Sequence, residues 1–176
     1  MANALDLTPD SHLAGTLVAL RGLTYAGPAA DTQHLVPGVF FSLDPEGRTT
    51  VQVDSRPGSL LTMRFHVERP GRWMSLNLGV GVADFAGCRV ISFACKSDAR
   101  EVTSFRVCLR SGHAGGYRDV FFPKTVLCSP DTSVHMDVLE LAASDIPTQA
   151  LWRELVIFFE RETLEATLHD FRLTVI

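Results

Sequence analysis

The sequence lacks long apolar segments, blocks of basic residues and a recognisable export signal. No run approaches the ~18 consecutive apolar residues of a membrane-spanning helix. The net charge of the 176-residue chain is −4, opposite in sign to that of a basic nucleic-acid-binding face. We therefore expect no membrane and no nucleic acid among its partners. Residues 1–8 show no basic start followed by an apolar core, so we expect a cytoplasmic protein if the chain begins at its natural N-terminus, and a secreted one if a signal peptide has been removed.

Cysteine is sparse, and its spacing does not form a metal site. Cys88, Cys95, Cys108 and Cys128 show no CxxC pair and no histidine at metal-site distance. Because free cysteine is among the most often buried side chains, we favour four reduced packing residues over a disulfide or a reactive thiol.

Sequence signatures of common enzymes are also missing. Gly79-Val80-Gly81 lacks the third glycine of a dinucleotide loop, and there is no Gly-Lys-Ser/Thr loop, no nucleophile elbow and no HExxH motif. Glycoside hydrolysis needs two acids facing each other across a cleft. The candidate acids are Glu68, Asp137 and Asp170, but nothing in the sequence brings any two together. We therefore expect that the protein is not an enzyme. A glycan-active enzyme is the less favoured alternative.

What the sequence does contain is a strict alternation of apolar and polar residues over residues 60–80. A side-chain period of two predicts a half-buried antiparallel hairpin, here joined across residues 69–72. The predicted core residues are Leu61, Met63, Phe65 and Val67 in the first arm, and Met74, Leu76, Leu78 and Val80 in the second.

The other face of this predicted hairpin places Trp73 beside polar side chains. Residues directly opposed in a sheet project from the same side, so Trp73 should face Glu68. Indole planes stack on sugar rings, and neighbouring polar groups can satisfy hydroxyls. Arg106 and Arg110 extend this face if their strand lies beside the hairpin, as does Tyr117 if the adjacent glycine loop exposes it. The predicted ligand-binding residues are therefore Trp73, Arg64, His66, Glu68, Asn77, Arg106, Arg110 and Tyr117.

Each aromatic or basic candidate also has a simpler structural interpretation. Trp73 is then an indole covered by a loop or a partner subunit, and Arg106 and Arg110 are solvated or salt-bridged. Trp152 precedes an apolar strand, so we expect it in the core.

The rest of the chain has turn signals about every ten residues, which is typical of a β-sandwich or a β-barrel. Residues 1–15 are expected to be irregular, residues 16–23 a strand and residues 25–37 a long surface loop. Residues 150–167 also fit helical spacing, but their β-branched and aromatic types favour a buried strand. We therefore predict an all-β fold with little helix, an antiparallel two-sheet β-sandwich forming one domain over residues 1–176.

The second half of the chain contains a distinctive series of predicted strands and short motifs. They are the strands 90–97 and 105–111, the stretches Leu139-Glu140-Leu141 and Asp145-Ile146, Trp152, and the closing His169-Asp170-Phe171-Arg172-Leu173. In these residues the chain resembles the jelly-roll sandwich of carbohydrate-binding modules and the wider galactose-binding-like group. The resemblance spans roughly residues 73–176, whereas the first half lacks the Asn- and Gly-rich opening common in such modules. It implies a non-catalytic jelly-roll domain.

The same resemblance places a calcium-coordinating acid in the last strand of many such modules, which points to Asp170. Calcium takes about six to eight oxygen ligands, and a single acid does not supply them. The residues alone favour a surface carboxylate paired with an arginine. Apart from this structural calcium, we expect no cofactor.

Together these features predict a non-catalytic recognition module that binds a glycan or another polyhydroxylated ligand on an exposed sheet face. The alternative is a structural or assembly domain that uses the same face for protein contacts, including contacts with a second copy of itself.

Overall fold

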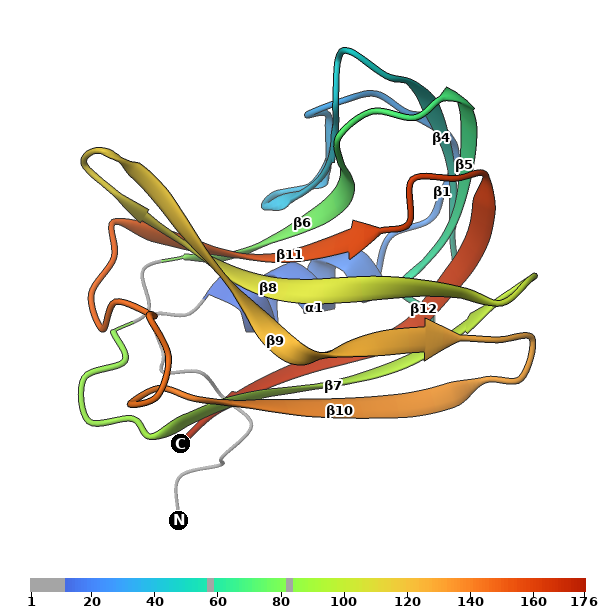
Figure 1. Ribbon diagram of the computed structural model, residues 1–176. Coiled ribbons are helices and arrows are strands. Elements are labelled where there is room, and N and C mark those ends of the chain that lie inside the picture. The colour runs from blue at the N-terminus through green and yellow to red at the C-terminus, as the bar shows by residue number, and fades with distance from the viewer. Residues whose placement is uncertain (1–11, 57–58, 82–83) are drawn as a thin grey trace.

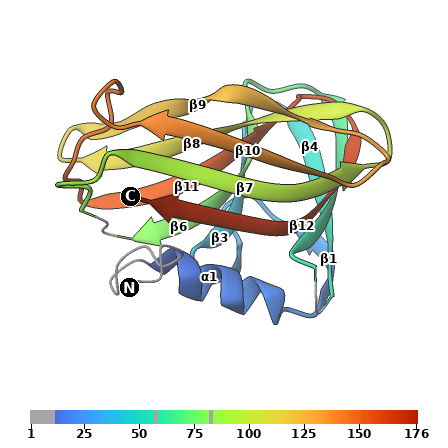
Figure 2. The same ribbon diagram turned by 90° about the horizontal axis from the view of Figure 1, so that it is seen from below.

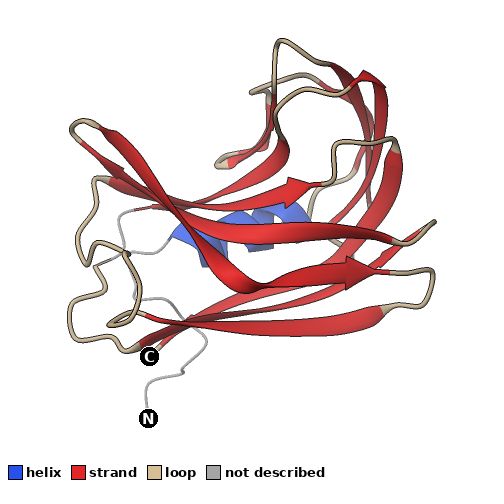
Figure 3. Cartoon of the chain, in the orientation of Figure 1, coloured by secondary structure: helices blue, strands red, loops and turns tan. Residues whose placement is uncertain are grey.

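The computed structural model describes residues 12–56, 59–81 and 84–176, which form one helix and twelve strands (Figure 1 and Figure 3). The helix α1 comprises His12–Arg21. The strands are β1 (Tyr25–Ala29), β2 (His34–Val36), β3 (Val39–Leu43), β4 (Arg48–Ser55), β5 (Leu61–Arg69), β6 (Met74–Gly81), β7 (Val90–Ala99), β8 (Thr103–His113), β9 (Gly116–Cys128), β10 (Ser133–Glu140), β11 (Trp152–Phe159) and β12 (Leu164–Val175).

The strands form two antiparallel sheets of six strands each. The first sheet has the order β1-β4-β5-β12-β7-β10, and the second has the order β2-β3-β6-β11-β8-β9. Figure 1 shows β6, β11, β8 and β9 as the upper layer over β12, β7 and β10, whereas β1, β4 and β5 bend upward at the right. The predicted all-β, two-sheet sandwich is confirmed, including strands in place of a helix over most of residues 150–167.

Side chains that alternate along the strands fill the space between the sheets. Phe65 of β5 is 1% exposed, and its ring lies 5.7 Å from that of Phe41 and 5.0 Å from that of Phe159, centroid to centroid. Phe41 and Phe159 belong to the second sheet and Phe65 to the first, so this cluster joins the two layers. The predicted core residues of β5 and β6 are buried or, for Val67, partly buried.

The predicted hairpin between β5 and β6 is wrong. β5 pairs with β4 and β12 of the first sheet, and β6 pairs with β3 and β11 of the second, so residues 70–73 cross between the layers. The buried Asp44 carboxylate anchors this crossing by accepting hydrogen bonds from the backbone N–H and Nε of Arg72, at 2.6 and 3.0 Å. Gly71 fits because a Cβ there would lie 2.6 Å from Cβ of Asp44. A turn signal marks where a strand ends, but it does not say which strand pairs next.

The first strand predicted from the sequence, residues 16–23, is also wrong, because α1 covers most of it. Leu17 and Leu20 are buried, whereas Val18 is exposed, which is the spacing of one helical face. The helix contacts β6, beside which Figure 2 shows it, and also β2. Among the described residues, no helix is long and apolar enough to cross a membrane.

The segments around α1 differ from the sequence prediction as well. The expected loop over residues 25–37 contains β1 and β2. The segment expected to be irregular, residues 1–15, includes the start of α1 at His12, and residues 1–11 lie outside the described part of the chain. Short strands and helices rich in Ala, Gly and Pro carry little local signal, and tertiary packing decides them.

All four cysteines are unbridged, as the sequence predicts. Cys95, Cys108 and Cys128 are buried, and Cys88 is partly buried. Burial raises the pKa of the Cys95 thiol to about 12, so this side chain is a packing residue rather than a nucleophile.

Candidate functional site

The structure divides the eight predicted ligand-binding residues between two faces. Each sheet has an outer face, directed away from the core. Because β5 and β6 belong to different sheets, the predicted single surface does not exist. Trp73, Asn77, Arg106, Arg110 and Tyr117 belong to the outer face of the second sheet, whereas Arg64, His66 and Glu68 belong to the outer face of the first.

One end of the second-sheet face is an aromatic platform built from β11, β8 and β9. Trp152, Gly112 and Tyr117 lie opposite one another across these three strands. The indole of Trp152 covers Gly112 so closely that a Cβ there would lie 2.1 Å from the ring. Trp152 is 37% exposed and Tyr117 is 56% exposed. The prediction that Trp152 lies in the core is therefore wrong.

The phase of β11 explains why Trp152 points outward. Leu155, Ile157 and Phe159 are buried in the core, so residues of even number along this strand project to the outer face. This alternation was visible in the sequence and could have placed Trp152 correctly. A position just before an apolar strand does not by itself put a tryptophan in the core.

Ion pairs and stacked cations hold the platform in place. Arg110 donates to both carboxylate oxygens of Asp119, each at 2.7 Å, and its guanidinium lies 4.1 Å from the centroid of the Tyr117 ring. Burial alone would lower the pKa of Arg110, but the hydrogen bond to Asp119 raises it, so Arg110 stays charged. The guanidinium thus forms a cation–π contact with the tyrosine ring, which stabilises the ring in this position.

Next to the platform lies a row of hydrogen-bonding groups. Asn77 Nδ2 donates to Glu154 Oε2 at 3.1 Å, and Ser75 Oγ donates to Asn77 Oδ1 at 2.9 Å. Asn77 and Ser75 are 1% exposed, so they orient Glu154 more than they meet solvent. Arg106 is exposed, and its guanidinium lies 4.2 Å from the Phe121 ring centroid.

Trp73 marks the opposite end of the same face. It is half-buried, and its Nε1 donates to Ser42 Oγ at 3.1 Å. The guanidinium of Arg72 lies 5.2 Å from the indole centroid. At a strand rise of ~3.3 Å per residue, Trp73 and Trp152 are roughly 25 Å apart along the strands. Trp73 is therefore on the face that contains the platform, although not at its centre.

Asp170, the residue expected to bind a structural calcium, lies among arginine side chains. Its carboxylate forms ion pairs with Arg21 of α1 and, at 3.0 Å, with Arg172 of β12. Among the described residues, no group of three or more His, Cys, Asp or Glu side chains is placed to hold a metal ion. The structural calcium stays a prediction, and an ion at Asp170 would have to displace these arginines.

The ion pairs with the two arginines predict how the ionisation of Asp170 affects the stability of the fold at low pH. Burial alone would raise the pKa of Asp170, but hydrogen bonds and charge from Arg21 and Arg172 lower it. Its stabilising effect is therefore complete above the unfolded-state pKa of about 4 and is lost as pH falls through the lower folded-state pKa. We expect Asp170→Asn to flatten the loss of melting temperature on acidification from about pH 6 to pH 3.

The control for this prediction is Asp131→Asn, a change at an exposed side chain that should follow the wild-type acid profile. A melting profile of Asp170→Asn parallel to wild type over the whole range would contradict the assignment.

Comparison with known proteins relates the fold to carbohydrate-binding modules. No protein-family model and no curated sequence matches the chain. A family 4 carbohydrate-binding module superposes with a TM-score of 0.58 and 14% identity, over 85% of this chain and 94% of that one. A family 30 module gives 0.56 and 13%, over 86% and 99%. The family 11 module of Clostridium thermocellum, in complex with a β-1,3-1,4-mixed-linked tetrasaccharide, gives 0.54 and 7%, over 86% and 96%.

At these identities the likeness establishes the fold. The chain has the jelly-roll β-sandwich of carbohydrate-binding modules, as the resemblance in its second half predicts.

Proposed function

We propose that the protein is a non-catalytic module that binds carbohydrate on the outer face of its second sheet. The observation that carries this proposal is the indole of Trp152, exposed over Gly112 and beside Tyr117. Flat aromatic surfaces cover the apolar faces of sugar rings, and convergent polar groups orient the hydroxyls. The Arg110–Asp119 and Asn77–Glu154 pairs supply those groups beside the platform.

The acids on this face support binding rather than glycoside hydrolysis. Asp119 accepts two hydrogen bonds from Arg110, and Glu154 accepts one from Asn77. A hydrolase needs one acid free to donate a proton and a second free to attack or to activate water. Fold neighbours bound to a mixed-linked tetrasaccharide or named for xylan binding point to β-linked glycans as the first ligands to test.

Removing the platform should abolish this binding. We expect Trp152→Ala to weaken binding to soluble mixed-linked β-glucan or xylan by about 30-fold or more, as for a central aromatic contact. Gly112→Ala should have a similar effect with the indole still present, because the new Cβ displaces the ring. Isothermal titration calorimetry measures both affinities.

The matched control is Met136→Ala, which removes an exposed apolar side chain from β10 of the other sheet and should leave binding unchanged. Thermal melts confirm that each variant is folded. If folded Trp152→Ala binds either glycan like wild type, the ligand is not held on this face.

The alternative, an assembly domain, is favoured by a different surface. Val134, Met136 and Val138 are each more than half exposed on β10, the edge strand of the first sheet. Opposite them on β7 lie Lys96, Ala94 and Ser92, so the small residues leave Met136 and Val138 open while a lysine flanks Val134. If this surface joins two copies of the chain, light scattering should give a dimer mass for wild type and a monomer mass for Met136→Glu. A monomeric wild type at every concentration would exclude self-assembly.

A further inference from the structure

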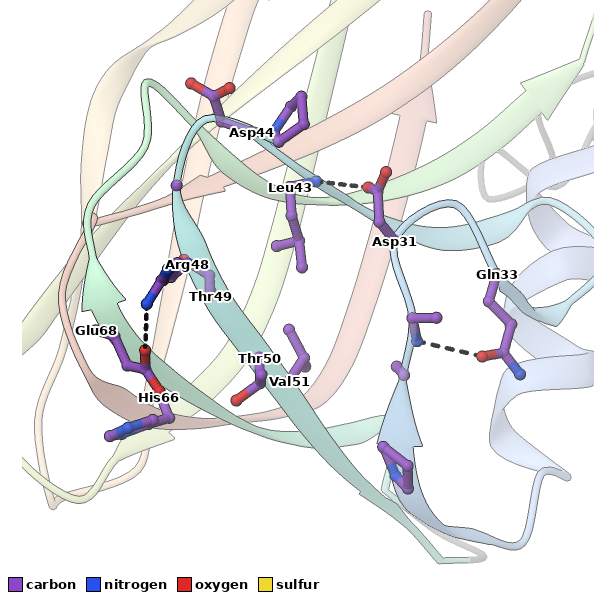
Figure 4. Close-up of a pocket in the computed structure, with 15 residues that line it drawn as sticks. Asp31, Gln33, Leu43, Asp44, Arg48, Thr49, Thr50, Val51, His66 and Glu68 are labelled. Atoms are coloured by element: carbon purple, nitrogen blue, oxygen red, sulfur yellow. Dashed lines mark hydrogen bonds and ion pairs between the residues drawn. The ribbon is translucent and has the colours of Figure 1, made fainter.

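Two adjoining hollows lie on the β4–β5 side of the first sheet, away from the Trp152 platform. The larger has a volume of about 720 Å³ and lies between residues 28–33, the turn after β3 and the start of β4 (Figure 4). The smaller has a volume of about 450 Å³ and lies between β5 and the two turns at residues 100–103 and 162–165. Each is within the range of small-molecule sites, ~300–1,000 Å³.

The two hollows meet at Thr50 and His66, which line both of them. These residues are opposed in the β4–β5 ladder, and both are exposed. The hollows therefore adjoin at this pair of residues, and we call the two together the trough. Three of the eight residues predicted as ligand contacts, Arg64, His66 and Glu68, line this trough rather than the platform.

Hydrogen-bonding side chains line the larger hollow. Figure 4 shows the Arg48–Glu68 ion pair beside His66 on one wall, with Asp31 and Gln33 on the other. Gln33 Oε1 accepts a hydrogen bond from the backbone N–H of Ala30 at 3.2 Å, which leaves its amide donors available to a ligand.

Hydrogen-bonding side chains line the smaller hollow as well. Gln52 and Arg64 face it from β4 and β5, and Arg64 forms an ion pair with Glu165 at 3.2 Å. Apart from Phe65, which is 1% exposed and packs in the core, the described lining residues of both hollows include no phenylalanine, tyrosine or tryptophan. A ligand here is therefore held by hydrogen bonds, not by the ring stacking that the platform offers.

The charges of the trough disfavour an anionic ligand. Three acids and one arginine line the larger hollow, and three acids and two arginines line the smaller. A phosphate or uronate would meet net negative charge in both. Several of the acids are already paired, so a neutral ligand rich in hydroxyl groups fits the donors and acceptors that remain.

We propose that this trough is a second carbohydrate site, specific for a short neutral oligosaccharide and separate from the Trp152 platform. The proposal rests on the proposed function for the class of ligand, but not for the location. Since the two sites lie on different sheets of one sandwich, a single molecule can hold two glycan segments at once.

An isotope-labelled NMR titration with a mixed-linked β-glucan tetrasaccharide tests the proposal. Wild type should show two separate groups of shifted amides, one around Trp152 and Gly112 and one around Thr50 and His66. Trp152→Ala should lose the first group and keep the second. The double variant Gln52→Ala with His66→Ala, which truncates two exposed side chains, should show the reverse.

The outcomes separate the two proposals. Absence of shifts around Thr50 and His66 up to the solubility limit of the tetrasaccharide overturns the second site, whatever happens at the platform. Shifts there that vanish in folded Trp152→Ala also overturn it, because they would then be a remote effect of platform binding. Shifts confined to Thr50 and His66 support the second site and overturn the platform instead.

Bivalency supplies an independent measurement. Wild-type protein should cross-link soluble mixed-linked β-glucan and raise the light scattering of the mixture. Trp152→Ala and the Gln52→Ala, His66→Ala double variant should each bind without cross-linking. Cross-linking by the double variant equal to that of wild type would overturn the second site.

Discussion

Phe65→Ala should lower the free energy of unfolding by about 3–5 kcal/mol, because it opens a cavity where the two sheets meet. The Phe65 side chain is 1% exposed, and its ring packs between those of Phe41 and Phe159. Since its neighbours come from the other sheet, the loss weakens contact between layers and not only within one. A loss of this size is enough to unfold a domain of ordinary stability.

The neighbouring residue provides the control. His66→Ala changes an exposed side chain on the same strand and should alter stability by no more than about 0.5 kcal/mol. Urea unfolding followed by tryptophan fluorescence measures both variants. Equal destabilisation by the two would mean that β5 does not present alternate residues to the core and to solvent.

Arg153→Ala should be nearly as damaging, with an expected loss of about 3 kcal/mol or more, because buried polar groups would lose their donor. Arg153 is 1% exposed and faces inward from β11. Its guanidinium donates to Ser111 Oγ at 2.6 Å and to the carbonyl oxygens of Pro147 and Thr148 at 2.7 and 2.8 Å. It also lies 4.1 Å from the centroid of the Phe85 ring.

These contacts give Arg153 a definite structural role. They tie the segment before β11 and the segment that contains Phe85 to the end of the sandwich. Burial lowers the pKa of Arg153 to about 10, so the side chain is still protonated at neutral pH. Arg153→Lys should rescue only part of the loss, because a single ammonium group cannot reproduce the planar fork of donors.

Arg118→Ala is the control for the arginine. Arg118 is exposed, and it donates a long hydrogen bond of 3.4 Å to the carbonyl oxygen of Asp145. Thermal melts should therefore separate the two substitutions clearly. If Arg153→Ala melted near wild type, as Arg118→Ala should, the predicted loss of stability would be wrong. Water would then be able to replace the guanidinium at this position.

The same residues show why the site was harder to predict than the fold. Alternation over β5, β6 and β8 predicts correctly which side chains point into the core, because the face on which a side chain leaves a strand depends only on its position. It does not predict that Ser75 and Asn77, on the outer face of β6, are buried as well. Several strands with this alternation, separated by turn signals, bury their apolar sides by stacking in two layers or by closing into a barrel. For that reason an all-β layered fold was predictable without any knowledge of strand order, and the number of strands favoured the two-sheet sandwich.

Local periodicity does not determine which strands pair with each other. Residues 69–72 read equally well as a hairpin turn or as a crossing, and the choice depends on Asp44, which is distant in sequence and accepts the Arg72 hydrogen bonds. The hairpin prediction places Arg64, His66 and Glu68 on the same face as Trp73, whereas they lie on the outer face of the first sheet. It does not predict the trough, because the walls of the trough come from segments as far apart as Thr50 and Glu165.

The sequence by itself thus determined the fold class and the inward or outward phase of the main strands, because both follow from local periodicity and the need to bury apolar surface. Only the tertiary structure decided which strands are neighbours. The strand order places the indole of Trp152 over Gly112 and beside Tyr117, and it pairs Thr50 with His66 across β4 and β5. Such contacts depend on the packing of the whole chain, so no single segment encodes them.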